Sequence, residues 1–212
     1  MQARAKGALD RVGAALLLVA GAPALGAVAL WVLVESGRPV FFVRPRAGKD
    51  GVPFAMLKLR SMLPNAVEVA REHGLEDPFG LVANDPRVTR SGRFLRRTGL
   101  DELPQLVNVL RGEMSLVGPR PDLVEQAANY SEEDARRLCV KPGITGWSQI
   151  HGREDMTWPE RFRYDAWYLE HWSLALDLRI LVRTVGQLFR SEPVPVEDRL
   201  NVERARRRQS RA

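Results

Sequence analysis

The stretch TGLDELPQLVNVLRGEMSLVGPRP, Thr98–Pro121, places two acids side by side just before an apolar run. The apolar residues recur at helical spacing, at Leu103, Leu106, Val107 and Leu110. We therefore expect a helix here, with Asp101 as its N-cap and Pro104 in the first turn, where proline is tolerated. A cap explains one acid. It explains neither Glu102 beside it nor Arg120, which stands between two prolines at the end of the stretch.

A helix start that carries two carboxylates suggests phosphate chemistry through a metal ion. Unpaired backbone N–H groups at a helix start suit phosphate, yet Asp101 and Glu102 would repel it unless a divalent cation lay between them. Mg²⁺ is usually held by one or two carboxylates together with substrate phosphates. Arg120, on a stiffened backbone, is suited to phosphate oxygens. The alternative is that the acids only cap the helix and Arg120 lies in a surface turn.

Basic residues precede this stretch in two groups. Short apolar runs around a turn rich in Pro, Gly and Asp predict a two-stranded hairpin, residues 40–43 and 54–60. Lys58 and Arg60 alternate with leucines, so they are expected on one face of it, as phosphate ligands or as a solvated surface. The segment NDPRVTRSGRFLRRTG then brings five arginines into a second group, which indicates an anion site or, equally well when taken alone, a nucleic-acid patch: Arg87, Arg90, Arg93, Arg96 and Arg97.

The segments that follow the opening stretch suggest contacts to a nucleotide and to lipid. KPGITGWSQIHGRED is expected to be a glycine-rich loop in which Trp147, Gln149 and Arg153 contact a base or sugar, or simply a tight connection. Residues 157–189 predict two helices that break near Ser173. Their many aromatic residues suit amphipathic helices at a lipid headgroup layer, or helices packed on the core.

An uncharged run of 23 residues, Val12–Val34, lies near the start of the chain. It is long enough to span a bilayer as a helix, for which about 20 residues suffice. A secretory signal peptide is a second interpretation, although the apolar run continues well past its cleavage-like APA. A re-entrant hairpin is the third. Pro23 divides the run into limbs of about 11 residues, or about 16 Å each, half the hydrocarbon thickness.

The charges around the apolar run favour the hairpin. Basic residues lie on both sides of it: Arg4, Lys6 and Arg11 before, and Arg38, Arg44, Arg46 and Lys49 after. A straight span would carry one basic flank across the membrane, against the positive-inside tendency. A segment that enters and returns keeps both flanks on the cytoplasmic side.

Composition and missing motifs exclude several classes of binding site and enzyme. The 212 residues carry a net charge of +6, which suits a partner with negative charge, and one cysteine, which excludes an internal disulfide and a multi-cysteine metal site. The sequence contains no P-loop, no GxGxxG after a strand, no GxSxG and no HExxH motif. Residues 191–212 form a basic tail, expected to be solvated or to contact lipid.

The sequence resembles the bacterial sugar transferase family in three motifs that follow an apolar segment with a central proline. In order, they are KLRSM, NDPRVTRSGRFLRRTGLDELPQLVNVLRGEMSLVGPRP and KPGITGWSQIHGR. These are monotopic phosphoglycosyl transferases, and the resemblance covers roughly residues 9–189. It implies an enzyme on the cytoplasmic face of the bacterial inner membrane, with a UDP-sugar as donor and polyprenyl phosphate as acceptor, that releases UMP and requires Mg²⁺.

The resemblance also implies roles for individual residues. Asp101 matches the family's nucleophile, which forms a covalent phosphosugar intermediate, and Glu102 matches its partner. Arg96 and Arg120 match arginines implicated in phosphate binding. The apolar segment matches a helix-break-helix that re-enters one leaflet, with the break at Pro23.

Together these features predict a mainly helical α+β chain with a re-entrant membrane helix-break-helix at 1–36, a catalytic domain at 37–190 and a tail at 191–212. The catalytic domain would contain the short β-hairpin and interfacial amphipathic helices. The expected partners are the two substrates and membrane lipid, not nucleic acid, and a homodimer stays open. A different class, a membrane-anchored anion-binding scaffold without catalysis, is the alternative.

Overall fold

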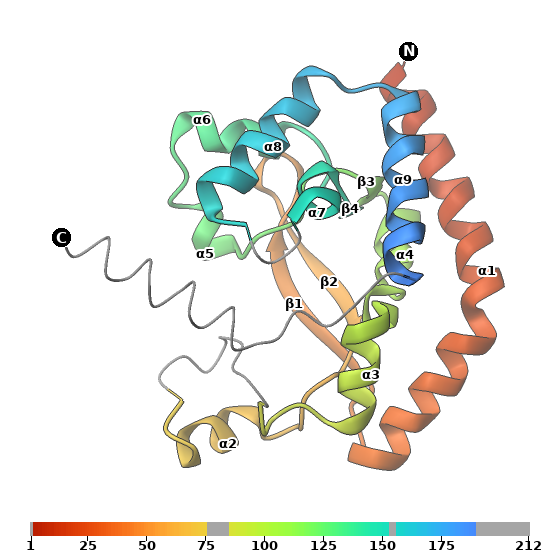
Figure 1. Cartoon of the computed structure of the whole chain (residues 1–212), viewed down its shortest axis with the longest axis vertical. Helices are drawn as coiled ribbons and strands as arrows, with labels where there is room; N and C mark the ends of the chain where they lie inside the picture. Colours follow the sequence, from red (N-terminus) through yellow and green to blue (C-terminus); the bar gives the residue numbers. More distant parts are fainter. Residues whose placement is uncertain (1, 76–84, 153–155, 190–212) are drawn as a thin grey trace.

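The computed structural model describes residues 2–75, 85–152 and 156–189, and these form a mainly helical molecule with two small sheets (Figure 1). The elements are α1 (Gln2–Ser36), β1 (Phe41–Ala47), η1 (Lys49–Gly51), β2 (Pro53–Leu59), α2 (Ala66–Glu72), α3 (Arg90–Thr98), η2 (Leu100–Glu102), α4 (Gln105–Arg111), β3 (Ser115–Val117), α5 (Val124–Ala127), α6 (Glu132–Ala135), η3 (Arg136–Cys139), β4 (Gly143–Thr145), α7 (Trp147–Gly152), α8 (Trp158–Glu170) and α9 (Leu174–Phe189). The predicted tail and Arg153 lie outside the described residues.

The predicted hairpin is confirmed and is longer than expected. Strands β1 and β2 pair antiparallel from Phe41 opposite Leu59 to Ala47 opposite Pro53. The turn between them places Asp50 and Gly51 in the left-handed region, at φ 56° and 75°. The sequence prediction ended the first strand too early, at residue 43, because Pro45 argues against a strand. Proline is tolerated in a strand at an edge.

Helix α1 runs without interruption through Pro23, so the predicted break is not a gap in the helix. A proline inside a helix removes one backbone hydrogen bond and typically bends the helix without ending it. In Figure 1 α1 is bent along its length and follows one side of the molecule. Residues Ala5–Ser36 are long and apolar enough to cross a membrane, and only 11% of their most apolar window is buried. One such helix is weak evidence of membrane association.

The rest of the molecule packs along the inner side of α1. Ala14, in its first half, joins the main core with residues of α4, β3 and α9. Val28 and Val32, in its second half, pack on Leu59 of β2 and Leu95 of α3. At the midpoint, a Cβ placed on Gly21 would lie 3.8 Å from Leu103 Cδ1. The middle of α1 therefore runs beside the residue that follows the acid pair.

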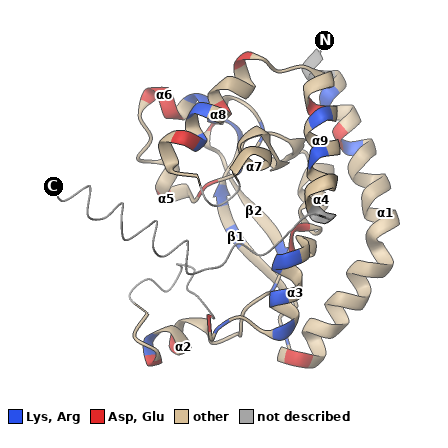
Figure 2. Ribbon diagram, viewed as in Figure 1, with Lys and Arg blue, Asp and Glu red and all other residues tan. Residues whose placement is uncertain are grey.

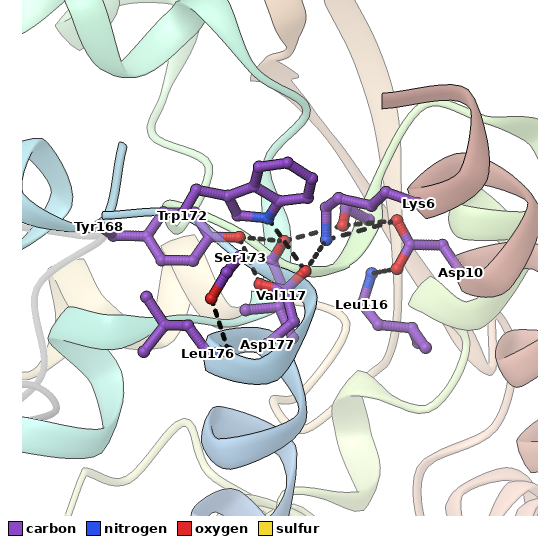
Figure 3. A network of polar contacts seen from close by, with 10 residues as sticks. Lys6, Asp10, Leu116, Val117, Tyr168, Trp172, Ser173, Leu176 and Asp177 are labelled. Carbon is purple, nitrogen blue, oxygen red and sulfur yellow. Dashed lines mark hydrogen bonds and ion pairs between the residues drawn. The ribbon is translucent and has the colours of Figure 1, made fainter. Parts of the chain in front are cut away.

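Polar contacts fasten α1 to the same body at both ends. Near its N-terminus, Lys6 Nζ lies 2.5 Å from Asp177 Oδ2 of α9 (Figure 3). Ser115 of β3 donates to Asp10 over 2.7 Å. Near its C-terminus, Arg60 Nη2 donates to Ser36 O and Gly37 O, both at 2.8 Å. Arg60 thereby satisfies carbonyls that the C-terminal end of the helix leaves unpaired.

The Glu35 carboxylate at the end of α1 receives two further hydrogen bonds. They come from the backbone N–H groups of Arg90 and Ser91, at the start of α3, over 2.7 and 2.8 Å. A carboxylate is well placed there because the first N–H groups of a helix have no partner within the helix. The C-terminal end of α1 is therefore joined to α3 as well as to β2.

Two predictions about local structure were wrong. Asp101 does not cap the helix: the acids lie on the separate 3₁₀ turn η2, and Pro104 occupies the cap position of α4. Gly99, at φ 71°, reverses the chain before η2, and a side chain would be strained there. The segment expected as a glycine-rich loop forms strand β4 and helix α7, and β4 pairs in parallel with β3. The two helices α8 and α9, with the break near Ser173, are confirmed.

Candidate active site

The acid pair lies where η2, β2 and the turn after β3 meet. Glu102 Oε1 accepts hydrogen bonds from Lys58 Nζ over 2.7 Å and from Arg120 Nη2 over 2.8 Å. Asp101 Oδ2 is 4.0 Å from the same Lys58 Nζ and accepts no hydrogen bond from the described residues. The structure thus brings together four of the predicted site residues, which come from three separate parts of the sequence.

The two neighbouring carboxyl groups differ in pKa. Burial raises the pKa of Asp101 to about 6, and the charge of Glu102 opposes the attraction of Lys58. Burial acts in the same direction on Glu102, but Arg120 and Lys58 outweigh it and lower its pKa to about 2. Glu102 is therefore ionised throughout the physiological range, whereas Asp101 changes charge near pH 6.

This difference suits distinct chemical roles. Glu102 is fully neutralised by its two cations and holds them in place. Asp101 has side-chain exposure of 13%, is mainly ionised at neutral pH, and keeps its oxygens out of hydrogen bonds with described residues. A carboxylate with a raised pKa and oxygens that form no hydrogen bond is the better nucleophile of the two.

A buried ionic network fixes the turn that carries Arg120. Arg137 Nη2 donates to the Arg120 carbonyl over 2.9 Å and pairs with Asp165 Oδ2 at 2.7 Å. Arg137 Nη1 also pairs with Asp122, which accepts a hydrogen bond from the Tyr130 hydroxyl. Because Arg137 and both carboxylates are almost wholly buried, the turn is held from its inner side.

The predicted phosphate ligands Arg96 and Arg60 do not donate hydrogen bonds to the acid pair. Arg96 Nε donates to Ser61 Oγ over 2.9 Å, and its charge still acts on Asp101, where it opposes the rise in pKa. Arg60 is buried at the C-terminal end of α1, where its contacts are structural. The arginine group does not form one shared site: Arg87 is fully buried and paired with Asp85.

The predicted nucleotide contacts, Trp147 and Gln149, lie on α7 and are used in packing. The Trp147 ring stacks on Trp167 of α8, with centroids 4.5 Å apart. Gln149 donates to the Ile144 carbonyl over 3.0 Å, and its Oε1 is buried with no hydrogen-bond partner in the described residues. Among the described residues, the hydrogen bonds and ring contacts of both side chains are with β4, α7 and α8, and none is with the acid pair.

Two residues of the site were missed by the sequence interpretation. Arg137 was not singled out, because nothing in its local sequence distinguishes a buried arginine from a surface one. Arg46 was counted only among the basic residues that flank the apolar run. The alternation of Arg44 and Arg46 along the strand was the available signal, since it places both on one face of the hairpin.

The carboxylates fit a magnesium ion that is held jointly with a substrate. Within residues 2–75, 85–152 and 156–189, no three His, Cys, Asp or Glu side chains gather into a metal site. Mg²⁺ needs only one or two carboxylates when water and substrate phosphates complete its coordination. Asp101, with oxygens that accept no hydrogen bond from described residues, is able to supply such a ligand, and Glu102 is the second carboxylate.

The site combines a partly buried acid pair with fixed cations beside an apolar helix, an arrangement suited to phosphate chemistry. Comparison with known proteins agrees. The family model described as bacterial sugar transferase matches residues 1–191. This chain therefore belongs to the bacterial sugar transferase family.

Its relatives include short and long proteins. It is 42% identical over 173 residues to the uncharacterized sugar transferase EpsL of Bacillus subtilis, covering 82% of this chain and 81% of EpsL. It is 40% identical to a UDP-galactose-lipid carrier transferase of Erwinia amylovora, covering 88% of this chain and 41% of the relative. It is 43% identical to a UDP-glucose:undecaprenyl-phosphate glucose-1-phosphate transferase of Xanthomonas campestris, covering 87% of this chain and 39% of the relative. The chain thus spans most of EpsL but about two fifths of the longer relatives.

Proposed function

We propose that this protein transfers a sugar 1-phosphate from a UDP-sugar to polyprenyl phosphate, with Asp101 as nucleophile, and releases UMP. The observation that carries the proposal is the asymmetry of the acid pair: Glu102 is bound by Lys58 and Arg120, and Asp101 accepts no hydrogen bond from the described residues. The names of the relatives from Erwinia amylovora and Xanthomonas campestris, which specify UDP-sugars, lipid carriers and sugar 1-phosphate transfer, support the same reaction.

The reaction proceeds in two displacements at one phosphorus atom. An Asp101 carboxylate oxygen attacks the sugar-bearing phosphorus of the UDP-sugar, and the bond from this phosphorus to the bridging oxygen breaks, so that UMP leaves. A phosphate oxygen of polyprenyl phosphate then attacks the same phosphorus and expels the Asp101 carboxylate. The product is a polyprenyl diphosphate sugar. Two steps separate two reactants that are both anionic and would otherwise have to meet directly.

The cations of the site lower the cost of bringing these anions together. Lys58 and Arg120 are held by Glu102, so they keep their positions when a diphosphate binds. Mg²⁺, bound by Asp101 and Glu102 together with substrate phosphates, would neutralise further charge on the diphosphate. The ionised Glu102 keeps both cations facing the site at any physiological pH, since its pKa is about 2.

We infer that α1 enters one leaflet and returns, with the domain on the cytoplasmic face. Lys6 is bound to α9 at one end of the helix, and Arg60 of the same folded body binds the other end. A straight span would place these ends on opposite sides of the membrane, whereas one compact domain contacts both. Figure 2 supports the arrangement: α1 carries charged residues towards its two ends and none between.

The proposal is tested by UMP release from purified full-length protein in lipid nanodiscs. A panel of UDP-sugars with Mg²⁺ and polyprenyl phosphate is expected to yield UMP with at least one donor. Asp101→Asn should lower the rate by about a thousandfold or more, as loss of a nucleophile does. If the folded protein releases UMP from no donor, or if Asp101→Asn is as active as the parent, the chain is a scaffold or uses another mechanism.

A further inference from the structure

Arg46 on β1 is a half-buried cation that has no protein partner in the described structure. Its Nε is buried without a hydrogen-bond acceptor, and no hydrogen bond or ion pair joins its side chain to any other described residue. Burial lowers the pKa of Arg46, and the like charges of Arg120 and Arg44 lower it further; the charges of Asp122 and Glu102 raise it but do not outweigh them. A guanidinium that loses water and gains neighbours of the same sign is held at a cost in free energy.

Among the described residues, the three arginines that are buried outright all have oxygen acceptors for part of their side chains, although Arg60 Nε and Nη1 also lack one. The half-buried Arg161 packs over the Trp158 ring, with its Cζ 5.0 Å from the ring centroid. Arg137 lies between the carboxylates of Asp122 and Asp165. Arg87 is paired with Asp85, and Arg60 donates to three oxygen atoms at the end of α1. Each of these has a structural reason for being buried, and Arg46 has none in the described part of the chain.

The position of Arg46 connects it to the active site. In the hairpin register Arg46 lies opposite Phe54 and Arg44 opposite Met56, so both arginines share a face with Lys58, two residues beyond Met56. Lys58 contacts Glu102 from that face. The end of β1 is also joined to the turn that carries Arg120, because the Ala47 N–H donates to the Asp122 carbonyl over 3.0 Å.

The positive charge around Arg46, Arg120 and Lys58 is not fully balanced by the nearby carboxylates. Lys58 and Arg120 are offset by the acid pair, and Asp122 is already bound by Arg137 and Tyr130. The positive charge of Arg46 is therefore in excess. A phosphate group would supply the missing anion, and a guanidinium binds phosphate well because it offers parallel donors.

We propose that Arg46, together with Arg120, binds a phosphate group of a reactant. This rests on the proposed function, which supplies two sources of that chemistry: the diphosphate of the UDP-sugar and the phosphate of the polyprenyl acceptor. In either case the bound phosphate lies on the Arg46–Arg120 side of Glu102 and beside the strand that carries Arg46.

Arg46→Met tests the inference, because it keeps an apolar side chain and removes the charge. Since no protein partner is lost, the melting temperature of the unliganded protein should stay the same or rise. Arg137→Met is the matched control: it leaves two buried carboxylates uncompensated and should lower the melting temperature clearly. Binding of UDP with Mg²⁺, by calorimetry in nanodiscs, and the KM for polyprenyl phosphate are then compared with the parent.

The expected result is a rise of about tenfold or more in the Kd for UDP or in the KM for polyprenyl phosphate, as for a lost charged hydrogen bond. A change in UDP binding assigns the donor diphosphate to Arg46, and a change in the KM alone assigns the acceptor. Arg46→Lys should recover part of the loss. Both constants within twofold of the parent, or a fall in melting temperature like that of Arg137→Met, would overturn the inference.

The outcome also separates this inference from the proposed function. If the parent protein releases UMP and Arg46→Met behaves like it, the transferase reaction stands and the role of Arg46 is wrong. If the parent binds UDP through Arg46 but releases no UMP from any UDP-sugar, the phosphate site stands and the transferase reaction is wrong.

Discussion

Asp101 and Glu102 are adjacent in the sequence, yet their environments push their pKa values in opposite directions, to about 6 and about 2. The cause is the placement of two cations. Lys58 and Arg120 both lie within hydrogen-bond distance of Glu102, and Lys58 is 4.0 Å from Asp101. One carboxylate thus stabilises the fold and the other is kept at a cost, as is common for catalytic groups.

Replacing Asp101 by asparagine should stabilise the protein while it abolishes turnover. The pKa of Asp101 is about 6 in the folded protein against an ordinary 3.8, so its ionisation disfavours folding above pH 6, and this penalty disappears as the pH falls towards 4. We expect Asp101→Asn to raise the free energy of unfolding by up to about 3 kcal/mol at pH 7.5, and by much less at pH 4. Denaturant unfolding at both pH values measures this; equal effects would contradict it.

Replacing Glu102 by glutamine should have the opposite effect on stability. Its folded pKa of about 2 lies below the ordinary 4.5, so its ionisation favours folding above pH 4.5, and this contribution is lost as the pH falls towards 2. Glu102→Gln should cost about 2–3 kcal/mol at pH 7. A Glu102→Gln protein as stable as the parent at neutral pH would mean that the pairs with Lys58 and Arg120 contribute nothing.

At the residue scale, the sequence predicted the centre of the site but not how it is supported. The acid pair, Lys58 and Arg120 could be picked out because their residue types match phosphate chemistry. The functions of Arg60, Arg46 and Arg137 could not, because an arginine that binds a helix end, one that lacks a partner and one inside an ionic network look alike in sequence. Only the tertiary contacts distinguish them.

At the scale of elements, the proposed topology of α1 rests on the polar contacts that hold both of its ends. Near the N-terminus, Asp177 accepts hydrogen bonds from Lys6 over 2.5 Å, Tyr168 over 2.7 Å and Trp172 over 3.2 Å (Figure 3). This group joins α1, α8 and α9 around one buried carboxylate. The far end of α1 is held by β2 and α3 through Arg60 and the Glu35 carboxylate.

Loss of the Asp177 charge should loosen the N-terminal end of α1. Asp177→Asn leaves Lys6 without its nearest carboxylate, so we expect a loss of about 2–4 kcal/mol in the free energy of unfolding. Glu170→Gln is the matched control, because Glu170 pairs with Arg136 at the surface, with both side chains more than half exposed, and should cost under about 1 kcal/mol. Thermal unfolding in nanodiscs compares the two, and equal losses would argue against the fastening.

Both ends of α1 should be inaccessible to an impermeant thiol reagent in intact cells. Single cysteines at Ala5 and Arg38, both exposed positions, are placed in a Cys139→Ser background, since Cys139 is itself exposed. We expect labelling at both positions only after the cells are opened. Labelling of the Ala5→Cys protein alone in intact cells would show a straight span. Pro23→Leu should shift the equilibrium towards such a span, because the bend would lose its cause.

The elements that could be predicted are those determined by residues close together in the sequence. The hairpin, α8 and α9 follow from alternation, turn residues and helical periodicity, all of which are local. The parallel pairing of β3 with β4 depends on two segments about 28 residues apart, each of three residues, and no local pattern marks them. The 3₁₀ turn that carries the acids results from Gly99 and Pro104 acting together.

At the scale of the whole molecule, large apolar side chains are exposed along α1 and α9, and the N-terminal ends of these two helices are joined by the Lys6–Asp177 pair. On α9 the exposed apolar residues recur at helical spacing, at Leu174, Leu178, Val182 and Val185. Large exposed apolar surfaces on a folded chain mark contact with lipid or protein. The acid pair lies behind the midpoint of α1, which suits an enzyme whose acceptor is a lipid and whose donor is soluble in water.

The covalent intermediate on Asp101 is the central claim, and intact-protein and peptide mass spectrometry test it most directly. Full-length protein in nanodiscs is mixed with Mg²⁺ and the UDP-sugar it accepts, without polyprenyl phosphate, and quenched in acid. We expect release of UMP up to one equivalent, and an added sugar phosphate on the peptide that contains Asp101, absent in Asp101→Asn. Addition of polyprenyl phosphate should then remove the added mass. UMP that appears only once polyprenyl phosphate is present, with no mass change on the protein, would contradict the covalent mechanism and indicate a single direct displacement.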